Sequence, residues 1–265
     1  DNKVIGVTTA SGDEIFCDHC VLAIGHSARD TFRMLYNKGI PMEPKAFAMG
    51  ARIEQKQSVI NLAQYGAENP VLPPADYKLA EHLEDGNVFT FCMCPGGFVV
   101  AAASEDGGIV TNGMSYSDRG GENANAALLV SVEPEDFPYE GVLGGVLWQE
   151  EIERKAFALT NSYHAPAQKV GDFLQGVPSV GPGKVEPTYR PGVHWCNLED
   201  VLPEKLTRSM REALPKLHRK LHGFADPEGV LTAPETRSSS PVRILRGQNR
   251  ESSCQGLYPC GEGAG

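Results

Sequence analysis

The chain has 265 residues and carries 24 Lys and Arg against 34 Asp and Glu, which gives a formal net charge of −10. A nucleic-acid groove needs clustered cations and an anionic membrane attracts basic surfaces, so neither nucleic acid nor a membrane is expected as a partner. Hydrophobic residues make up 41% of the chain and charged residues 22%, which is typical of globular proteins and excludes disorder for most of it. At this length we expect one large domain or two modest ones.

Cysteine usage indicates a reduced compartment. The seven cysteines are an odd number and do not form a recognisable disulfide framework, so we expect a cytoplasmic protein. Cys17-Asp-His-Cys20 has the spacing of a zinc hook, but the other close pair, Cys92-Met-Cys94, is spaced too tightly to complete it. Because Cys17 and Cys20 would point to opposite faces of a strand, we interpret them as buried packing residues and predict no metal site.

The chain opens with elements of a sheet. Residues 3–10 are β-prone, a turn follows at 11–13, and a return strand starts at Glu14. Residues 20–25 form a short apolar run that ends in glycine, as expected of a strand buried on both faces. The sequence then predicts a helix over 31–38, with Asp30 or Ser27 near its N-terminal cap.

The middle of the chain is first β-rich and then helical. A strand at 46–54 and a helix at 58–65 lead to short strands between glycine-rich turns, at 77–83, 88–93, 98–103, 109–113 and 128–132. Such regular spacing predicts an antiparallel sheet or a barrel. Further helices are expected at 142–159 and at 206–221, the second interrupted by Pro215, with a Pro- and Gly-rich loop at 176–192 between them.

The last segment returns to a strand at 256–260, followed by Gly261-Glu-Gly-Ala-Gly265. A glycine-rich turn after a strand usually feeds a helix whose N-terminus meets an anion. Because the chain ends in that turn and begins at Asp1 rather than at a methionine, we expect it to be a segment of a longer protein. The element order predicts an α+β fold, in which a β-rich and helical domain is inserted into a nucleotide-binding sheet.

Gly25-His-Ser-Ala-Arg29 lies between a predicted strand and a predicted helix and is close to a nucleophile elbow. Its fifth position is Arg29, whose side chain resists the sharp turn that a second glycine permits. A serine hydrolase built on Ser27 therefore stays a minor alternative. The other interpretation is a closely packed strand-to-helix turn.

Two stretches rich in arginine and small polar residues are candidates for ligand binding. The stretch 235–244 holds Arg237 and Arg243 just before the last strand, where they could hold a phosphate or the electron-rich end of a flavin. The stretch 115–125 is polar, broken by glycines, and lies within the β-rich region.

Taken together, these segments resemble a bacterial family of FAD-dependent dehydrogenases within the flavoprotein superfamily that has two dinucleotide-binding motifs. The matching stretches are 18–30, 94–104, 111–125, 235–243 and 257–265. The resemblance implies that residues 1–39 and 236–265 are parts of an α/β FAD-binding domain, and that 40–235 is an insert domain covering the flavin.

The resemblance also implies the cofactor contacts. The turn after Ala23-Ile-Gly25 would pass near the flavin, and the acid of the Gly261-Glu262 pair would bond the ribityl chain of FAD. The residues expected to contact the cofactor are Gly25, His26, Arg237, Arg243, Gly261, Glu262 and Gly263. No residue is singled out as catalytic acid or base.

This chain departs from the family pattern at both ends: the helix expected after Gly265 is absent, and so are the first nucleotide motif and the acid that follows it for the adenosine ribose. The G-x-G-x-x-G turn for the pyrophosphate is absent and would lie before Asp1. We therefore expect the intact protein to be an FAD-dependent oxidoreductase of undefined substrate, with NAD(P)H or a protein as electron partner. The chain alone is expected to bind no FAD and to be inactive. A non-catalytic protein-binding module, presenting the acidic stretch 133–153, is a further alternative.

Overall fold

The computed structural model describes residues 2–67 and 71–264, so Gly265, the last residue of the predicted glycine-rich turn, lies outside the described residues. The chain divides into two compact units. The first comprises residues 1–47, 133–148 and 237–265, and the second comprises 48–132 and 149–236. Of the predicted insert, 40–235, residues 48–132 and 149–235 fall in the second unit, whereas 40–47 and 133–148 group with the first.

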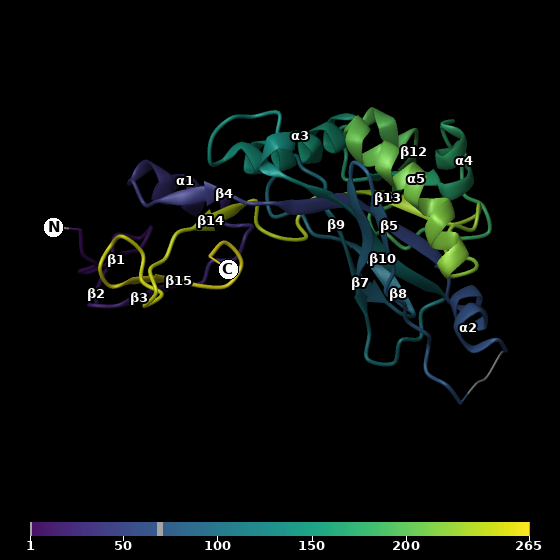
Figure 1. The fold of residues 1–265 in the computed structure, drawn as a ribbon, viewed down its shortest axis with the longest axis horizontal. Helices are drawn as coiled ribbons and strands as arrows, with labels where there is room; N and C mark the ends of the chain where they lie inside the picture. Colours follow the sequence, from purple (N-terminus) through teal and green to yellow (C-terminus); the bar gives the residue numbers. More distant parts are fainter. Residues whose placement is uncertain (1, 68–70, 265) are drawn as a thin grey trace. The chain divides into compact units, whose positions relative to one another are not determined.

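The described part of the first unit contains three small two-stranded sheets, the helix α1 and the start of a second helix (Figure 1). β1 (Gly6–Thr8) and β2 (Glu14–Phe16) form the antiparallel hairpin that the sequence predicts. β3 (Cys20–Leu22) pairs in parallel with β15 (Leu257–Pro259), and β4 (Met42–Pro44) pairs antiparallel with β14 (Val242–Ile244). The helix α1 (Arg29–Asn37) follows β3, and a 3₁₀ turn covers Pro134–Asp136.

The core of the first unit forms because α1 is amphipathic. Phe32 and Leu35 lie one turn apart on its buried face and are 1% and 6% exposed. They pack with apolar residues of the neighbouring strands and of the segment 142–146, which are Ile40, Met42, Val146, Val242, Ile244 and Leu257.

The predicted strand at 20–25 is shorter and less buried than expected. β3 ends at Leu22, and Val21 is 68% exposed. The prediction of burial on both faces is therefore wrong here, because in the described residues β3 pairs only with β15 and packs on one side alone.

The second unit is built on one large mixed sheet with the order β12-β11-β13-β5-β10-β7-β6. Its strands are β12 (Val193–Trp195), β11 (Ala165–Lys169), β13 (Val230–Glu235), β5 (Phe47–Lys56), β10 (Asn123–Val132), β7 (Gly86–Cys94) and β6 (Ala80–Leu83). A separate antiparallel hairpin consists of β8 (Gly97–Ala101) and β9 (Thr111–Ser115). The helices are α2 (Gln57–Tyr65), α3 (Gly144–Ala158), which begins in the first unit, α4 (Val170–Gln175) and α5 (Glu204–Lys220), with a 3₁₀ turn at Leu198–Asp200.

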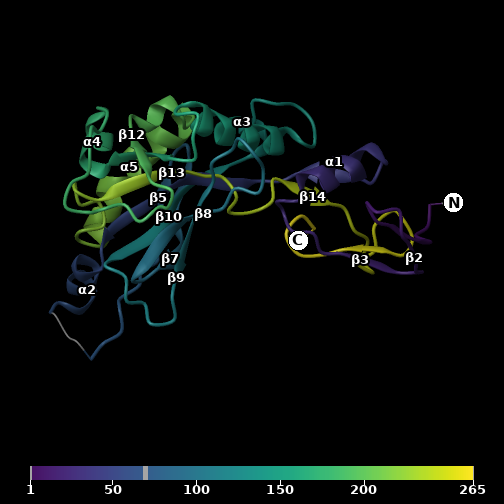
Figure 2. The same cartoon turned by 180° about the vertical axis from the view of Figure 1, so that it is seen from behind.

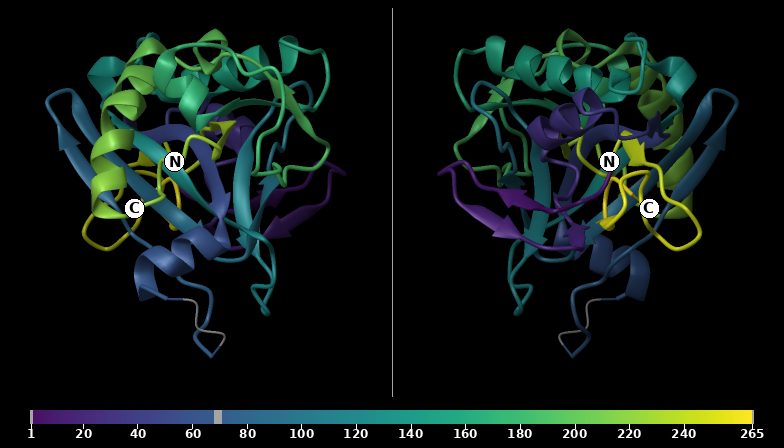
Figure 3. Two further views of the ribbon diagram at one scale, coloured as in Figure 1. Left: turned by 90° about the vertical axis from the view of Figure 1, so that its right-hand side faces the viewer. Right: turned by 90° about the vertical axis from the view of Figure 1, so that its left-hand side faces the viewer.

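The large sheet is covered on both faces. α4 and α5 pack on one face, which Figures 1 and 3 show above the strands. The β8–β9 hairpin packs on the other face, and Figure 2 shows it from behind. Alternation along the central strand β5 fits this arrangement: Ile53 and Gln55 face the helices, whereas Arg52 and Glu54 face the hairpin side.

The coarse prediction of an α+β fold is confirmed, but the barrel is not. Of the strands between 77 and 132, β8 and β9 form a hairpin of their own. β6, β7 and β10 pair antiparallel with one another, as predicted, but they join β5 in an open sheet whose other half comes from later residues. Helix α5 also runs through Pro215 without the predicted interruption, since Met210, Leu214 and Leu217 are fully buried against the sheet and hold the helix in place. Among the residues that the structure describes, no helix has the length and apolar composition of a membrane span.

Candidate functional site

Two glycine turns lie at the same edge of the parallel pair β3–β15. Leu22 is in register with Pro259, and the N–H of Cys260 donates to the carbonyl of Leu22 at 3.0 Å. Each strand is followed by a left-handed glycine, Gly25 with φ +72° and Gly261 with φ +68°. A Cβ at either glycine would meet nothing within 4 Å, so both turns face open space. Ligands of α/β folds bind at this position, outside the carboxyl ends of parallel strands.

The turn at 261–263 presents backbone donors. Gly263 has φ +106° and packs so closely that a Cβ there would lie 2.6 Å from the ring of Phe32. Its carbonyl accepts from the N–H of Ile244 at 2.8 Å, which fixes the turn to β14. Within residues 2–67 and 71–264, the N–H groups of Gly261, Glu262 and Gly263 have no acceptor. Successive unpaired N–H groups in such a turn favour an anionic or electron-rich ligand.

Ionisable side chains gather around His26, the residue after Gly25. Burial lowers the pKa of the His26 imidazole, Glu262 acts in the opposite direction, and the nearby Arg237 and Arg29 lower it further. The imidazole also hydrogen-bonds to the backbone of Arg237, and a Glu262 carboxylate oxygen accepts from the N–H of Ser240 at 3.2 Å. The lowered pKa favours the neutral form of His26, whose charged neighbours include the buried residues Arg29 and Arg237 and the Glu262 carboxylate.

The structure thus brings together six of the seven residues predicted to contact the cofactor, which are Gly25, His26, Arg237, Gly261, Glu262 and Gly263. Arg243 lies elsewhere. It is the outward-facing residue of β14, between the buried Val242 and Ile244, and pairs with Glu43 of β4 at 3.0 Å. Both side chains of that pair are 44% exposed, so the pair is an ordinary surface ion pair.

The geometry around Ser27 does not resemble that of a hydrolase. A nucleophile elbow holds the serine itself in a strained conformation, but Ser27 is not among the residues with positive φ. In the part of the chain that the structure describes, its exposed hydroxyl has no hydrogen bond to a histidine.

The acidic stretch 133–153 does not form one exposed face. Glu150 and Glu153 are 5% and 2% exposed, and Glu153 accepts a hydrogen bond from the hydroxyl of Thr236 at 2.6 Å. The support for a protein-binding module is therefore weaker than the sequence indicated.

The cysteines at 17 and 20 are not buried as expected. Both are partly exposed, because Cys17 lies outside the strands and Cys20 is on the edge strand β3. Burial raises the pKa of the Cys20 thiol, and the charge of the neighbouring Cys17 raises it further.

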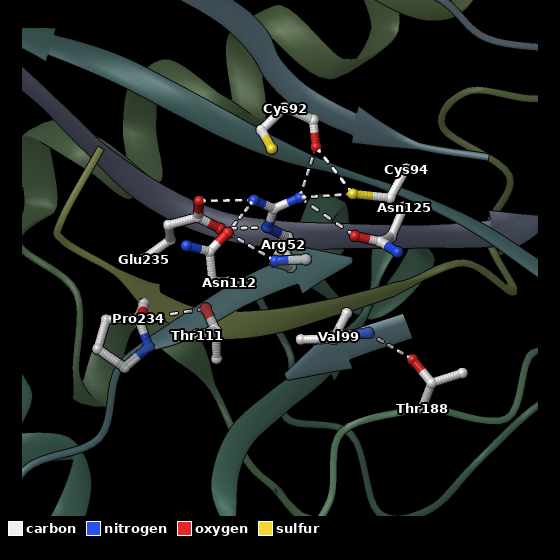
Figure 4. Close-up of polar contacts among 11 residues, drawn as sticks. Arg52, Cys92, Cys94, Val99, Thr111, Asn112, Asn125, Thr188, Pro234 and Glu235 are labelled. Carbon is white, nitrogen blue, oxygen red and sulfur yellow. Dashed lines mark hydrogen bonds and ion pairs between the residues drawn. The ribbon is translucent and has the colours of Figure 1, made fainter. Parts of the chain in front are cut away.

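A second polar cluster lies in the second unit, between the large sheet and the β8–β9 hairpin (Figure 4). Arg52 is fully buried and donates twice to Glu235, at 2.9 Å from Nη2 to Oε1 and through Nε to Oε2. Its other N–H groups donate to the side chains of Asn112 at 2.9 Å and Asn125 at 3.1 Å, and to the carbonyl of Cys92 at 2.8 Å. A Cβ at Gly113 would collide with Arg52 and Asn125, so this cluster depends on a glycine in β9.

Charge pairing holds Arg52 ionised in this interior. Burial disfavours the charged guanidinium, but the Glu235 carboxylate outweighs it and raises the pKa of Arg52. Two residues along β5, burial raises the pKa of Glu54, against hydrogen bonds from Thr188 at 2.6 Å and Asn123 at 3.1 Å. Arg52, Glu54 and the polar groups that contact them therefore form a buried polar layer along one face of β5.

The predictions from sequence did not include this layer. One available signal was the presence of Arg52 and Glu54 at alternate positions within an otherwise apolar strand. Another was Asn123-Ala-Asn-Ala126, at the end of the polar stretch 115–125, where polar and apolar residues alternate with the two-residue period of a strand.

Comparison with known proteins supplies a family assignment. Residues 46–238 match the sequence model of a family described as "FAD-dependent protein, C-terminal domain-like". A protein from Clostridium beijerinckii (strain ATCC 51743 / NCIMB 8052), named only as an uncharacterized protein, is 47% identical over 272 residues. That alignment covers 100% of this chain and 51% of the relative, so the chain spans about half the length of the relative that it matches.

Proposed function

The chain belongs to the FAD-dependent protein, C-terminal domain-like family, and from this membership we propose that it is part of a flavin-dependent oxidoreductase. We propose further that the glycine turns of the first unit, with His26, Arg237 and Glu262, contact the FAD. The observation that carries this assignment is the convergence of two open-facing left-handed glycines on the carboxyl ends of adjacent parallel strands.

The donor set suits an FAD molecule. Unpaired N–H groups at 261–263 can donate to phosphate or to the electron-rich edge of the ring system, and the Glu262 carboxylate can accept from a ribityl hydroxyl. FAD, when bound, supplies the electron-transfer chemistry, and the protein supplies position and electrostatics.

The chain's own residues have separable roles in this proposal. The buried guanidinium groups of Arg29 and Arg237 stabilise negative charge nearby. A neutral His26 both donates and accepts, and its bond to the backbone of Arg237 fixes the ring. The turns at Gly25 and Gly261 leave room for close backbone approach, which a side chain would restrict.

The whole protein is proposed to be about as long as the Clostridium relative. In that case the contacts to the pyrophosphate and adenosine come from residues outside this chain, and the electron partner is NAD(P)H or a protein. The substrate is proposed to be a small molecule.

The test is FAD retention by the full-length protein after dialysis, measured as flavin absorbance relative to protein. Glu262→Ala is expected to weaken FAD binding about tenfold, the effect of losing one charge-assisted hydrogen bond. Arg243→Ala is the matched control and should leave FAD binding unchanged, because Arg243 pairs with Glu43 instead. Unchanged retention in Glu262→Ala would contradict the assigned site.

A further inference from the structure

The strand β7 contains an irregularity at Cys92. Phe91 is in register with Ala127 and Cys94 with Asn125, so three steps along β7 match two steps along β10. Cys92 itself has φ +44°, in the left-handed region that a non-glycine residue rarely adopts. Such bulges and strained residues concentrate at functional sites, where the surrounding structure holds them in place.

The bulge brings the two cysteines of Cys92-Met-Cys94 together. Residues i and i+2 of a regular strand are about 6.6 Å apart, at the upper limit of the Cα separation that a disulfide spans. At the bulge, β7 fits three residue steps against two steps of β10, which requires a smaller rise per residue around Cys92 than in a regular strand. The sulfur of Cys94 already lies over the backbone of Cys92, 3.3 Å from its carbonyl oxygen.

The two thiols differ in their access to solvent. Cys92 is exposed, whereas Cys94 is 6% exposed. Burial raises the pKa of Cys94 to about 11, against the effect of Arg52, whose Nη1 is 4.0 Å from the Cys94 sulfur. Figure 4 shows the sulfur atoms of both residues beside the Arg52 guanidinium. An exposed thiol next to a buried one is the arrangement of an attacking and a resolving cysteine.

We propose that Cys92 and Cys94 form a redox-active dithiol that exchanges with soluble disulfides, with Cys92 attacking first and Cys94 resolving. This activity goes beyond flavin binding and does not require it. The Cys92 thiolate attacks one sulfur of a disulfide RSSR, forms a Cys92–SR mixed disulfide and releases RS⁻. Cys94 then attacks the Cys92 sulfur, the Cys92–Cys94 bond forms, and a second RS⁻ leaves and takes up the Cys94 proton. Two electrons pass from the cysteine pair to RSSR.

The probe is oxidised glutathione added to the folded, reduced full chain, followed by acid quenching, tryptic digestion and mass spectrometry. The digestion isolates residues 79–119, which contain Cys92 and Cys94 and no other cysteine. In the wild type this peptide should lose two hydrogens and carry no glutathione. In Cys94→Ser it should carry one stable glutathione on Cys92.

Two further variants complete the test. In Cys92→Ser the buried Cys94 should stay unmodified, and in Cys196→Ser, which changes a buried cysteine on another segment, the peptide should behave as in the wild type. A wild-type peptide that stays reduced or keeps a glutathione adduct would overturn the proposal. So would a Cys94→Ser peptide that fails to trap the adduct.

Discussion

Arg52 of β5 and Glu235 of β13 form a two-point ion pair inside the large sheet. The Nη2–Oε1 distance is 2.9 Å, and the side chains are 0% and 5% exposed. Breaking such a pair from one side leaves a buried, uncompensated charge, which costs far more than removal of both charges together. A substitution that removes only one of these two charges, on β5 or on β13, is therefore expected to destabilise the fold more than a substitution that removes both.

Arg52→Met is expected to lower the free energy of unfolding by about 3–5 kcal/mol, because Glu235 is then buried without its cation. The double variant Arg52→Met/Glu235→Met should be less destabilised than the sum of the single variants, since neither charge remains. Urea denaturation of the wild type, Arg52→Met, Glu235→Met and the double variant measures this coupling between the two charges. Arg243→Met breaks an exposed ion pair and should cost about 1 kcal/mol or less. Additive effects of the two buried substitutions would contradict the pairing.

Glu54 should make the protein less stable as the pH rises. Its pKa in the folded protein is raised above the ordinary value of 4.5. Between these two values the unfolded chain has lost the Glu54 proton while the folded protein still holds it, so unfolding becomes easier with rising pH. The slope is about 1.4 kcal/mol for each pH unit inside the window, and the penalty is complete above the raised pKa.

Glu54→Gln removes this titration. The free energy of unfolding of the wild type, relative to Glu54→Gln, should therefore fall as pH rises above 4.5. Denaturation curves for both proteins at a series of pH values check the sign. Parallel pH profiles would show that Glu54 does not titrate differently in the folded protein.

The two glycines of the proposed flavin turn should differ in their tolerance of alanine. Gly261→Ala places a side chain in open space at positive φ and is expected to cost about 1 kcal/mol in the free energy of unfolding. Gly263→Ala is expected to cost about 3 kcal/mol, because its Cβ also collides with the buried ring of Phe32. Thermal unfolding of both variants measures the difference. Equal losses would mean that Phe32 yields to the added methyl group.

Local sequence patterns predicted helices and strands well where an element buries only one face and contacts residues close to it in the sequence. The helix predicted over 31–38 is found as α1, whose buried face carries Phe32 and Leu35, and the turn predicted at 11–13 joins the first hairpin. The family resemblance, carried by glycine and arginine motifs, is confirmed as membership of an FAD-dependent family.

The pairing of strands that lie far apart along the chain was harder to predict from the sequence. Nothing in the sequence near β5 shows that its neighbours are β13 and β10, which lie far from it along the chain. The antiparallel pairing of β6, β7 and β10 was therefore predictable, whereas their incorporation into a larger mixed sheet was not. The partners of Arg52 come from β7, β9, β10 and β13, and the polar layer exists only once those strands are assembled. Arg243 was expected near the flavin because its stretch precedes the last strand of the predicted nucleotide-binding sheet, but within the short strand β14 the alternation turns its side chain outward, which the sequence did not show.

The chain on its own is expected to bind FAD too weakly to detect at micromolar concentration. Each charge-assisted hydrogen bond from the turn at 261–263 contributes about 1.5–3 kcal/mol, and association itself costs about 4 kcal/mol or more. The pyrophosphate and adenosine contacts, which dominate dinucleotide binding, are proposed to lie outside the chain. Isothermal titration with FAD should give no heat of binding. Submicromolar affinity would contradict the proposed division of the cofactor site.

The central claim is that the protein containing this chain is a flavoprotein, and the absorption spectrum of the full-length protein as purified tests it most directly. We predict the two visible-region bands of an oxidised flavin, bleaching on addition of dithionite, and release of FAD rather than FMN when the protein is denatured. A full-length protein that is folded, colourless, and still colourless after incubation with excess FAD and dialysis would contradict the claim.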